Sequence, residues 1–268
     1  MNGTPEGLVL VYQKFLDTLR NYRPGDPTDS LVMERAGTIA VEYAPFDHVE
    51  RGAELVIVGL TPGRTQAANA LSSFTADLKR AVPIETALYN AKQTASFSGP
   101  MRANLLAMLD AVAVPAVYGR INAAEFFSAN RGLVHFTSAL RYPVFIDGNN
   151  YSGTPDPLKH PTLLAMIETY LAEEARALPN ATWIPLGRHA EAALLHLAAK
   201  GELARENILA GLPHPSGANA ERIAYFLGRK ARENLSPKTN PDKMDALKRE
   251  LVGQVSRLKS RLGEAPRP

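Results

Sequence analysis

The sequence predicts an α/β fold, a three-layer α/β/α sandwich around a short, mostly parallel central sheet. Short apolar runs rich in β-branched residues alternate with longer segments of helical periodicity along most of the chain, which is the pattern of successive βαβ units. Polar stretches rich in glycine and proline follow the apolar runs. Those are the positions where the carboxyl ends of parallel strands form binding sites.

Four apolar runs are expected to form the strands. The first, "ELVIVGL" (54–60), has the composition of a strand that is buried on both faces, and a glycine and a proline follow it. Three further runs occupy 132–140, 181–187 and 207–213. Because βαβ connections place successive strands parallel to one another, the four runs should end at one edge of the sheet.

Helices are expected between these strands. The segments with an apolar stripe at helical spacing are 8–20, 103–112, 161–178 and 188–201. Pro161 stands at a position that favours a helix start, and Gly201 at one that favours a helix end. We interpret residues 1–50 as a helical N-terminal element of a domain that extends to residue 235.

The C-terminal segment, 236–268, begins after the turn-rich stretch "ENLSPKTNP". It is predicted to form a basic amphipathic helix and a tail. Its apolar stripe consists of Met244, Leu247, Leu251, Val255, Leu258 and Leu262. A helix docked on the domain, a basic arm for DNA and a self-association helix all fit this pattern.

Composition excludes several classes of site. The chain has no cysteine, so it cannot hold a disulfide, a thiolate nucleophile, a cysteine-bound zinc ion or an iron–sulfur cluster. The formal net charge is +3, a weak indication of an anionic partner. No apolar run reaches the roughly 18 residues of a membrane span, and the N-terminus lacks the pattern of a signal peptide. We expect a cytoplasmic protein that does not bind membranes.

Two short motifs fall at the predicted sheet edge. "GLTPGRTQ" (59–66) follows the first strand, but it has neither the GK[ST] nor the GxGxxG pattern of a phosphate-binding loop. "GLPHPSGAN" (211–219) holds His214 between two prolines, which restrict its backbone. Taken singly, the first is also typical of a strand-to-helix turn and the second of a helix-capping turn.

Taken together, these motifs resemble those of the uracil-DNA glycosylase superfamily. Its branches carry first motifs such as GQDPYH, GINPG, GMNPG or GExPG and last motifs such as HPSPL, NPSGL or HPSPxN. "SFSGPMRANLLAML" (96–109) is similar to the stretch that supplies a stacking aromatic, and "VHFTSALRYP" (134–143) to the strand that reads the base. "WIPLGRHAEAALL" (183–195) resembles the helix before the last motif. The resemblance spans about residues 50–230, in the family's order.

The resemblance implies a DNA glycosylase, which flips a base into a pocket and hydrolyses its bond to deoxyribose. It points to His214 as the hydrogen-bond donor to the leaving base, with a packed or capping histidine as the alternative. Phe97 would stack on the base, although a core phenylalanine is the better interpretation without the resemblance. The implied base-binding residues are Gly59, Leu60, Pro62, Gly63, Phe97 and Ser138.

DNA contacts are implied on either side of that pocket. Ser216, Gly217 and the amides that lead into the next helix would grip a phosphate. The implied DNA-binding residues are Gln66, Arg188, His189, Ser216, Gly217, Ala218, Asn219 and Arg222.

Three departures from the family's pattern bear on the substrate. Thr61 stands where the GINPG and GMNPG branches have the asparagine that positions water, so the candidates for this role are Thr61 and Asp147, unless Asp147 is a solvated turn residue. Ser138 stands where uracil-selective members have asparagine, which leaves room for a modified pyrimidine. Ala218 replaces the usual wedge leucine, so another side chain fills the stack or the DNA is already distorted or single-stranded.

The sequence therefore predicts a monofunctional, monomeric DNA glycosylase that needs no metal or other cofactor. Its substrate would be a modified pyrimidine, for example a modified cytosine of phage DNA in antiviral defence, because "VIVGLTPGRTQ" with "GNNYSG" looks closer to antiviral members. Water would be the nucleophile, since no lysine occupies a motif position. The alternatives are a repair glycosylase for uracil or deaminated bases, and a non-catalytic module that binds damaged DNA or nucleotides.

Overall fold

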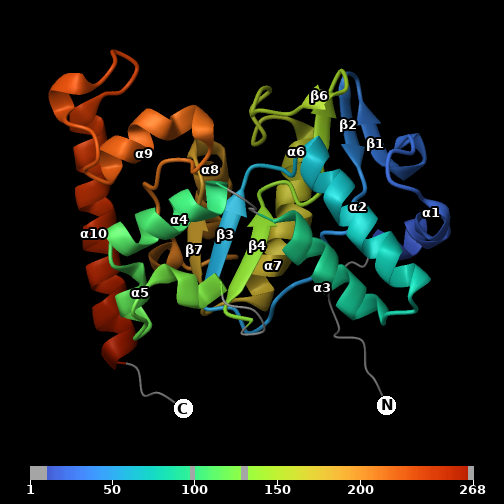
Figure 1. Cartoon of the computed structure of the whole chain (residues 1–268), viewed down its shortest axis with the longest axis horizontal. Helices are drawn as coiled ribbons and strands as arrows, with labels where there is room; N and C mark the ends of the chain where they lie inside the picture. Colours follow the sequence, from blue (N-terminus) through green and yellow to red (C-terminus); the bar gives the residue numbers. More distant parts are fainter. Residues whose placement is uncertain (1–10, 97–99, 128–131, 265–268) are drawn as a thin grey trace.

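The computed structural model describes residues 11–96, 100–127 and 132–264. Figure 1 shows a parallel sheet at the centre of the molecule, with a second, antiparallel sheet beside it. The parallel sheet has the order β4–β3–β7, formed by β4 (Val134–Ser138), β3 (Leu55–Gly59) and β7 (Thr182–Pro185). The predicted α/β class is confirmed, and three of the four predicted strands are present.

The fourth predicted strand, 207–213, is reduced to one parallel bridge between Ile208 and Trp183. The neighbouring backbone has another partner. The amide of Ala210 donates to Oε1 of Gln254 at 3.0 Å, so a side chain replaces the next rung of the ladder. Pro213, which has no amide hydrogen, follows shortly after.

The antiparallel sheet was not predicted. It has the order β1–β2–β5–β6, formed by β1 (Val32–Ala36), β2 (Ile39–Glu42), β5 (Val144–Ile146) and β6 (Asn149–Asn150). The interpretation of 1–50 as helical is therefore wrong beyond α1 (Leu16–Asn21), because a hairpin of two short strands follows it. Such strands leave too few alternations for a clear period in the sequence.

Helices cover both faces of the parallel sheet. Val56 and Val58 pack toward α2 (Arg64–Lys79), α3 (Ile84–Ala95) and α8 (Arg188–Ala199). Leu55 and Ile57 pack toward α4 (Pro100–Ala111), α5 (Val114–Val117) and α9 (Ala220–Phe226). The predicted helix 161–178 runs from α6 (Pro161–Met166) through a π-helical turn, η4 (Ile167–Leu171), to α7 (Ala172–Ala177). None of the described helices is long and apolar enough to cross a membrane.

The C-terminal helix α10 (Pro241–Glu264) runs along the side of the domain beside α5 and α9 (Figure 1). Leu251, Val255 and Leu258 are almost fully buried in the same core as Leu55 and Ile57. Of the three interpretations of this segment, the docked helix is the one that the structure contains.

We expect Leu251→Ala to lower the free energy of unfolding by about 2–5 kcal/mol, because it leaves a cavity under α10. Leu251 is 1% exposed, whereas the adjacent Val252 is 43% exposed. Val252→Ala should therefore change stability by less than about 0.5 kcal/mol. Urea unfolding followed by circular dichroism measures both, and equal effects of the two substitutions would show that α10 is not docked.

Candidate functional site

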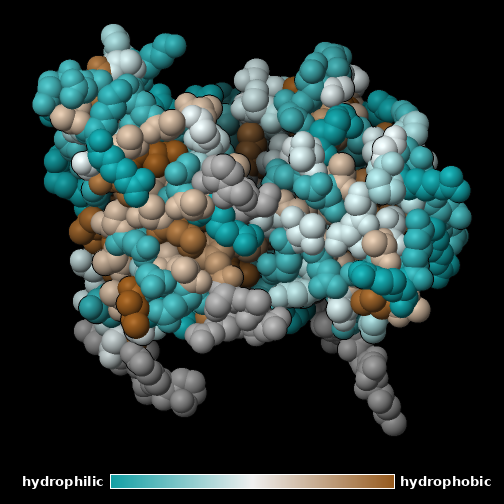
Figure 2. Space-filling model, viewed as in Figure 1, coloured by the Kyte–Doolittle hydropathy of each residue, from teal (hydrophilic) through white to brown (hydrophobic). Residues whose placement is uncertain are grey.

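The first sequence motif follows β3 at the carboxyl edge of the parallel sheet, and the last motif lies beside the loop after β7, since a Cβ added at Gly187 would lie 3.8 Å from His214 Cδ2. The pairing of β3 with β4 continues past the strands, since Ala139 N donates to Gly59 O at 2.8 Å and Leu140 N to Leu60 O at 2.9 Å. On the other side of β3, Leu186 N donates to Val58 O at 2.8 Å. Figure 2 shows the surface hollowed near this edge. Two hollows lie there, one near the end of β4 and one beyond the end of β7.

The first hollow is a small cavity of about 20 Å³ near the end of β4. We call it the β4 cavity. The side chains of interest in its lining are Pro62, Gln66, Lys92, Thr137, Ser138 and Arg141. Pro62 and Ser138, predicted from separate motifs to bind the base, are thus brought together. Ser96, the residue before Phe97, also lines the cavity, but Phe97 itself lies outside the described residues.

Gln66 was predicted to contact DNA, but its amide is engaged within the protein. Its Oε1 accepts from Gly63 N at 3.0 Å, and its Nε2 donates to Ala95 O at 3.4 Å. The first bond holds the loop at the N-terminus of α2. A Cβ added at Gly63 would lie 3.4 Å from the side-chain amide of Asn150. The lack of a side chain at Gly63 therefore allows the β5–β6 hairpin to pack closely against this loop.

A network of buried charges lies behind the β4 cavity. Arg141 Nε donates to Glu174 Oε1 at 2.8 Å, and its Nη2 donates to the carbonyl of Tyr170 in the π-helical turn at 2.8 Å. Lys92 Nζ donates to two backbone carbonyls, Phe46 O at 3.1 Å and His48 O at 2.6 Å. π-Helical turns often occur at functional sites, and here one presents its carbonyl to a buried guanidinium.

Burial or neighbouring charges lower the pKa values of three groups in this network, Lys92, His135 and Glu174. It lowers the pKa of Lys92 to about 8 and that of His135 to about 4, with Lys92 adding to the effect on His135. Burial alone would raise the pKa of Glu174, but Arg141 and Lys92 outweigh it and hold that pKa well below its usual value. At neutral pH His135 is therefore uncharged and Glu174 ionised.

Sequence reasoning missed this network. Lys92, Arg141 and Glu174 lie in three separate segments, and the helix that carries Lys92, α3, was itself not predicted. One signal was present: Lys92 follows Leu88 by four residues and therefore lies on the apolar face of its helix. A lysine at such a position is buried only when it is paired.

The second hollow is a groove of about 660 Å³ around His214, which we call the His214 groove. Ser216 N donates to His214 Nδ1 at 3.3 Å. This bond makes Nδ1 an acceptor, so Nε2 carries the proton of the neutral imidazole. Burial lowers the pKa of His214, which keeps the ring neutral at pH 7. The predicted phosphate-gripping amide of Ser216 thus orients the imidazole instead.

Four cationic side chains line the His214 groove, namely Arg188, Arg222, Lys238 and Lys243. Glu191 is the one carboxylate among the described residues in its lining. Arg188, Asn219 and Arg222 were predicted to bind DNA, and the structure brings them together beside His214. Lys238 and Lys243 were not predicted, because they belong to the C-terminal segment outside the resemblance.

Hydrogen bonds fix the segments that form the His214 groove. Asn104 Nδ2, in α4, donates to Pro215 O at 2.9 Å. Glu221 accepts from Ser236 N at 3.0 Å and from Thr239 Oγ1 at 2.6 Å. Glu221 thereby anchors the stretch that carries Lys238, while Arg222 Nη2 donates to Lys238 O at 3.2 Å.

The two candidates for positioning water have structural roles. Thr61 Oγ1 donates to Tyr142 O at 3.1 Å and accepts from Val144 N at 3.2 Å, so its proton is already used. Asp147 is exposed at the tip of the β5–β6 hairpin, where it has φ 48°. It lines neither hollow. Asp147 belongs to an Asp-Gly pair, the preferred pair for this tight turn, and so occupies the solvated turn position that its alternative interpretation describes.

The remaining predicted DNA-binding residues differ in their exposure. Gly217 and Ala218 are exposed in the turn before α9. His189 is less exposed, and burial together with the charge of Arg188 lowers its pKa. Its imidazole lies so close to Gly153 that an added Cβ there would overlap it. His189 therefore packs against the loop after β6.

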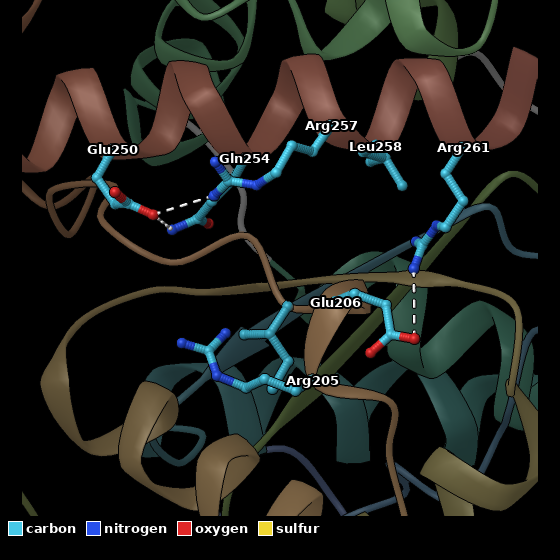
Figure 3. Close-up of a pocket in the computed structure, with 8 residues that line it drawn as sticks. Arg205, Glu206, Glu250, Gln254, Arg257, Leu258 and Arg261 are labelled. Atoms are coloured by element: carbon cyan, nitrogen blue, oxygen red, sulfur yellow. Dashed lines mark hydrogen bonds and ion pairs between the residues drawn. The ribbon is translucent and has the colours of Figure 1, made fainter.

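A third hollow lies between α10 and the 3-10 turn η5 (Arg205–Asn207) (Figure 3). Two of its three arginines face carboxylates. Arg257 Nη2 lies 3.2 Å from Glu250 Oε1, and Arg261 Nη1 lies 3.8 Å from Glu206 Oε1. Since Ile208 in its lining bridges to the start of β7, this hollow is away from the carboxyl edge.

Comparison with known proteins adds a relative. The chain is similar to "Uncharacterized protein YoxB" of Bacillus subtilis (strain 168), with 35% identity over 202 residues. The match covers 74% of this chain and 79% of YoxB. No family model and no solved structure matches the chain.

We expect the buried imidazole of His135 to make stability depend on pH. Its pKa is about 4 in the folded chain and about 6.5 when unfolded, so the unfolded state binds more protons between these values. Its contribution is complete above pH 6.5, and the free energy of unfolding should fall by about 1.4 kcal/mol per pH unit as the pH drops toward 4.

His135→Gln should flatten this dependence in urea titrations between pH 4 and 7. Thr137→Val is the control, because it alters the same strand, β4, without removing a titratable group. An unchanged pH slope in His135→Gln would contradict the burial of a neutral His135.

Proposed function

The chain belongs to the family of YoxB of Bacillus subtilis, and we propose that it is a monofunctional DNA glycosylase that hydrolyses the N-glycosidic bond of a flipped, modified pyrimidine. The proposal includes the uracil-DNA glycosylase-like fold that the motifs resemble. It is supported by the position of those motifs beside the loops that follow β3, β4 and β7 at one sheet edge.

One observation carries the proposal: His214 is held as a neutral donor at the mouth of a cationic groove. Ser216 N occupies Nδ1, and Nε2 has no partner among the described residues. When the glycosidic bond breaks, the base leaves with a negative charge, which an N–H aimed at one of its oxygens stabilises. One such preorganised donor is worth about 3–4 kcal/mol of barrier.

We assign the positioning of water to Glu191 instead of Thr61 or Asp147. Glu191 lies in the first turn of α8 and shares the His214 groove. Its carboxylate can accept a proton from water, which the engaged hydroxyl of Thr61 cannot do. A carboxylate near the sugar would also stabilise the positive charge that develops there as the base departs.

The charge of the His214 groove supports DNA as the partner. Four cations surround one carboxylate, and phosphates are the groups on DNA that cationic side chains bind. The turn that holds His214 borders the same groove as these cations, so a bound backbone would place a flipped nucleotide beside the imidazole.

We expect the wild-type protein to create alkali-labile sites in oligonucleotides that contain a modified pyrimidine. The panel consists of uracil, hypoxanthine, 5-hydroxymethylcytosine and its glucosylated form, each analysed by gel after alkali treatment. His214→Ala should lower the rate of base release by about 10²–10³-fold, because it removes the leaving-group donor. His196→Ala, on the far part of α8, should retain the wild-type rate.

The panel also separates the alternatives. Release of uracil alone would identify a repair glycosylase and refute the modified substrate. No release from any oligonucleotide, together with unchanged DNA binding by His214→Ala, would identify a non-catalytic DNA-binding module.

We expect the His214 groove to determine how DNA affinity depends on salt. Lys243→Ala and Arg188→Ala should each reduce the slope of log K against log salt by about 1, because each removes one phosphate contact. Lys259→Ala removes the same charge from an exposed position of α10 outside the groove and should leave the slope unchanged. Fluorescence anisotropy at several salt concentrations measures all three, and equal slopes would place the DNA elsewhere.

A further inference from the structure

The feature that carries this inference is the buried hydroxyl of Thr137. Its residue is 6% exposed, and Oγ1 has no hydrogen-bond partner among the described residues. Thr137 pairs with Val58 across the sheet, so its side chain lies on the face that α2 and α3 cover. Leaving a buried hydroxyl unpaired costs stability, and valine would fill the same space without that cost. The hydroxyl borders the β4 cavity.

The β4 cavity presents hydrogen-bond donors. Two of the three N–H groups of Lys92 go to backbone carbonyls, and Glu174 Oε1, at 3.9 Å, is too distant to take the third. No carboxylate occurs among the described residues in its lining. At pH 7 most of the Lys92 amines are protonated, since their pKa is about 8.

The size of the β4 cavity limits what it can hold. A volume of about 20 Å³ is close to that occupied by one water molecule. A whole base or a sugar substituent does not fit, whereas one oxygen atom at the edge of a base does. An oxygen would accept from Lys92 and pair with Thr137, which satisfies both groups at once.

We propose that the β4 cavity binds a single exocyclic oxygen of the flipped base, and that Thr137 and Lys92 are the residues that select it. This inference rests on the proposed glycosylase function. It defines the substrate class as pyrimidines with an oxygen on the edge remote from the sugar, either a ring carbonyl or the hydroxyl of a C5 substituent. Cytosine offers an amine at that edge, which a lysine ammonium cannot pair with.

The experiment compares Thr137→Val with Thr75→Val. Thr75 is also buried, at 2% exposed, but its Oγ1 donates to Ser72 O at 3.2 Å. Thr137→Val should have a Tm no lower than that of the wild type and a kcat/KM about tenfold lower on the oligonucleotide that the wild type cleaves. Thr75→Val should have a lower Tm and an unchanged kcat/KM. Comparing kcat/KM on the uracil oligonucleotide with kcat/KM on the 5-hydroxymethylcytosine oligonucleotide shows whether the bound oxygen is a carbonyl or a hydroxyl.

Two results would overturn the inference. One is an unchanged kcat/KM in Thr137→Val. The other is a lower Tm in that variant, since it would mean that Thr137 binds only a structural water. If the wild type releases no base at all, the proposed function fails, and a thermal-shift assay with free bases tests the inference instead. Free uracil or free 5-hydroxymethylcytosine should raise the Tm of the wild type more than that of Thr137→Val. Free cytosine should raise the Tm of neither protein.

Discussion

The buried ion pair of Arg141 with Glu174 is the interaction on which the rest of the site depends. The two side chains are 2% and 0% exposed and meet at 2.8 Å. Removing one member of such a pair leaves an uncompensated charge and costs about 3–5 kcal/mol. Lys92 and His135 share Glu174, so the carboxylate joins α7 to α3 and to β4. The pair thus fixes the loop after β4 against two helices.

That loop in turn positions the first motif. Thr61 Oγ1 bonds to the backbone of both Tyr142 and Val144, and the phenol of Tyr142 donates to the buried Asp47 at 3.0 Å. The "GLTPG" turn therefore takes its place from the segment that Arg141 anchors. The hydroxyl of Thr61 therefore supports the loop, at a position where the motifs that this stretch resembles carry asparagine.

The sequence predicts the elements that follow from local pattern. The apolar runs at β3, β4 and β7 and the stripe of α10 were located correctly, because burial and periodicity are properties of single segments. The charge network was not, since it joins residues that are more than 30 positions apart. Of the cationic side chains in the His214 groove, only the lysines of the C-terminal segment were missed. Asp147 shows the same limit. Its Asp-Gly turn could be predicted from the local sequence, but its absence from the linings of the β4 cavity and the His214 groove could not.

In the proposed reaction, the two hollows would divide the tasks between the two sides of β3. The β4 cavity has buried donors and room for one atom, which suits recognition, where an unpaired group penalises the wrong base. The His214 groove is wide, partly exposed and cationic, which suits a DNA backbone and a donor that acts as charge develops. Bulk on a modified base has no space in the first hollow. In the proposed complex that bulk would lie outside the β4 cavity, so the base would be identified by one oxygen and not by the size of its substituent.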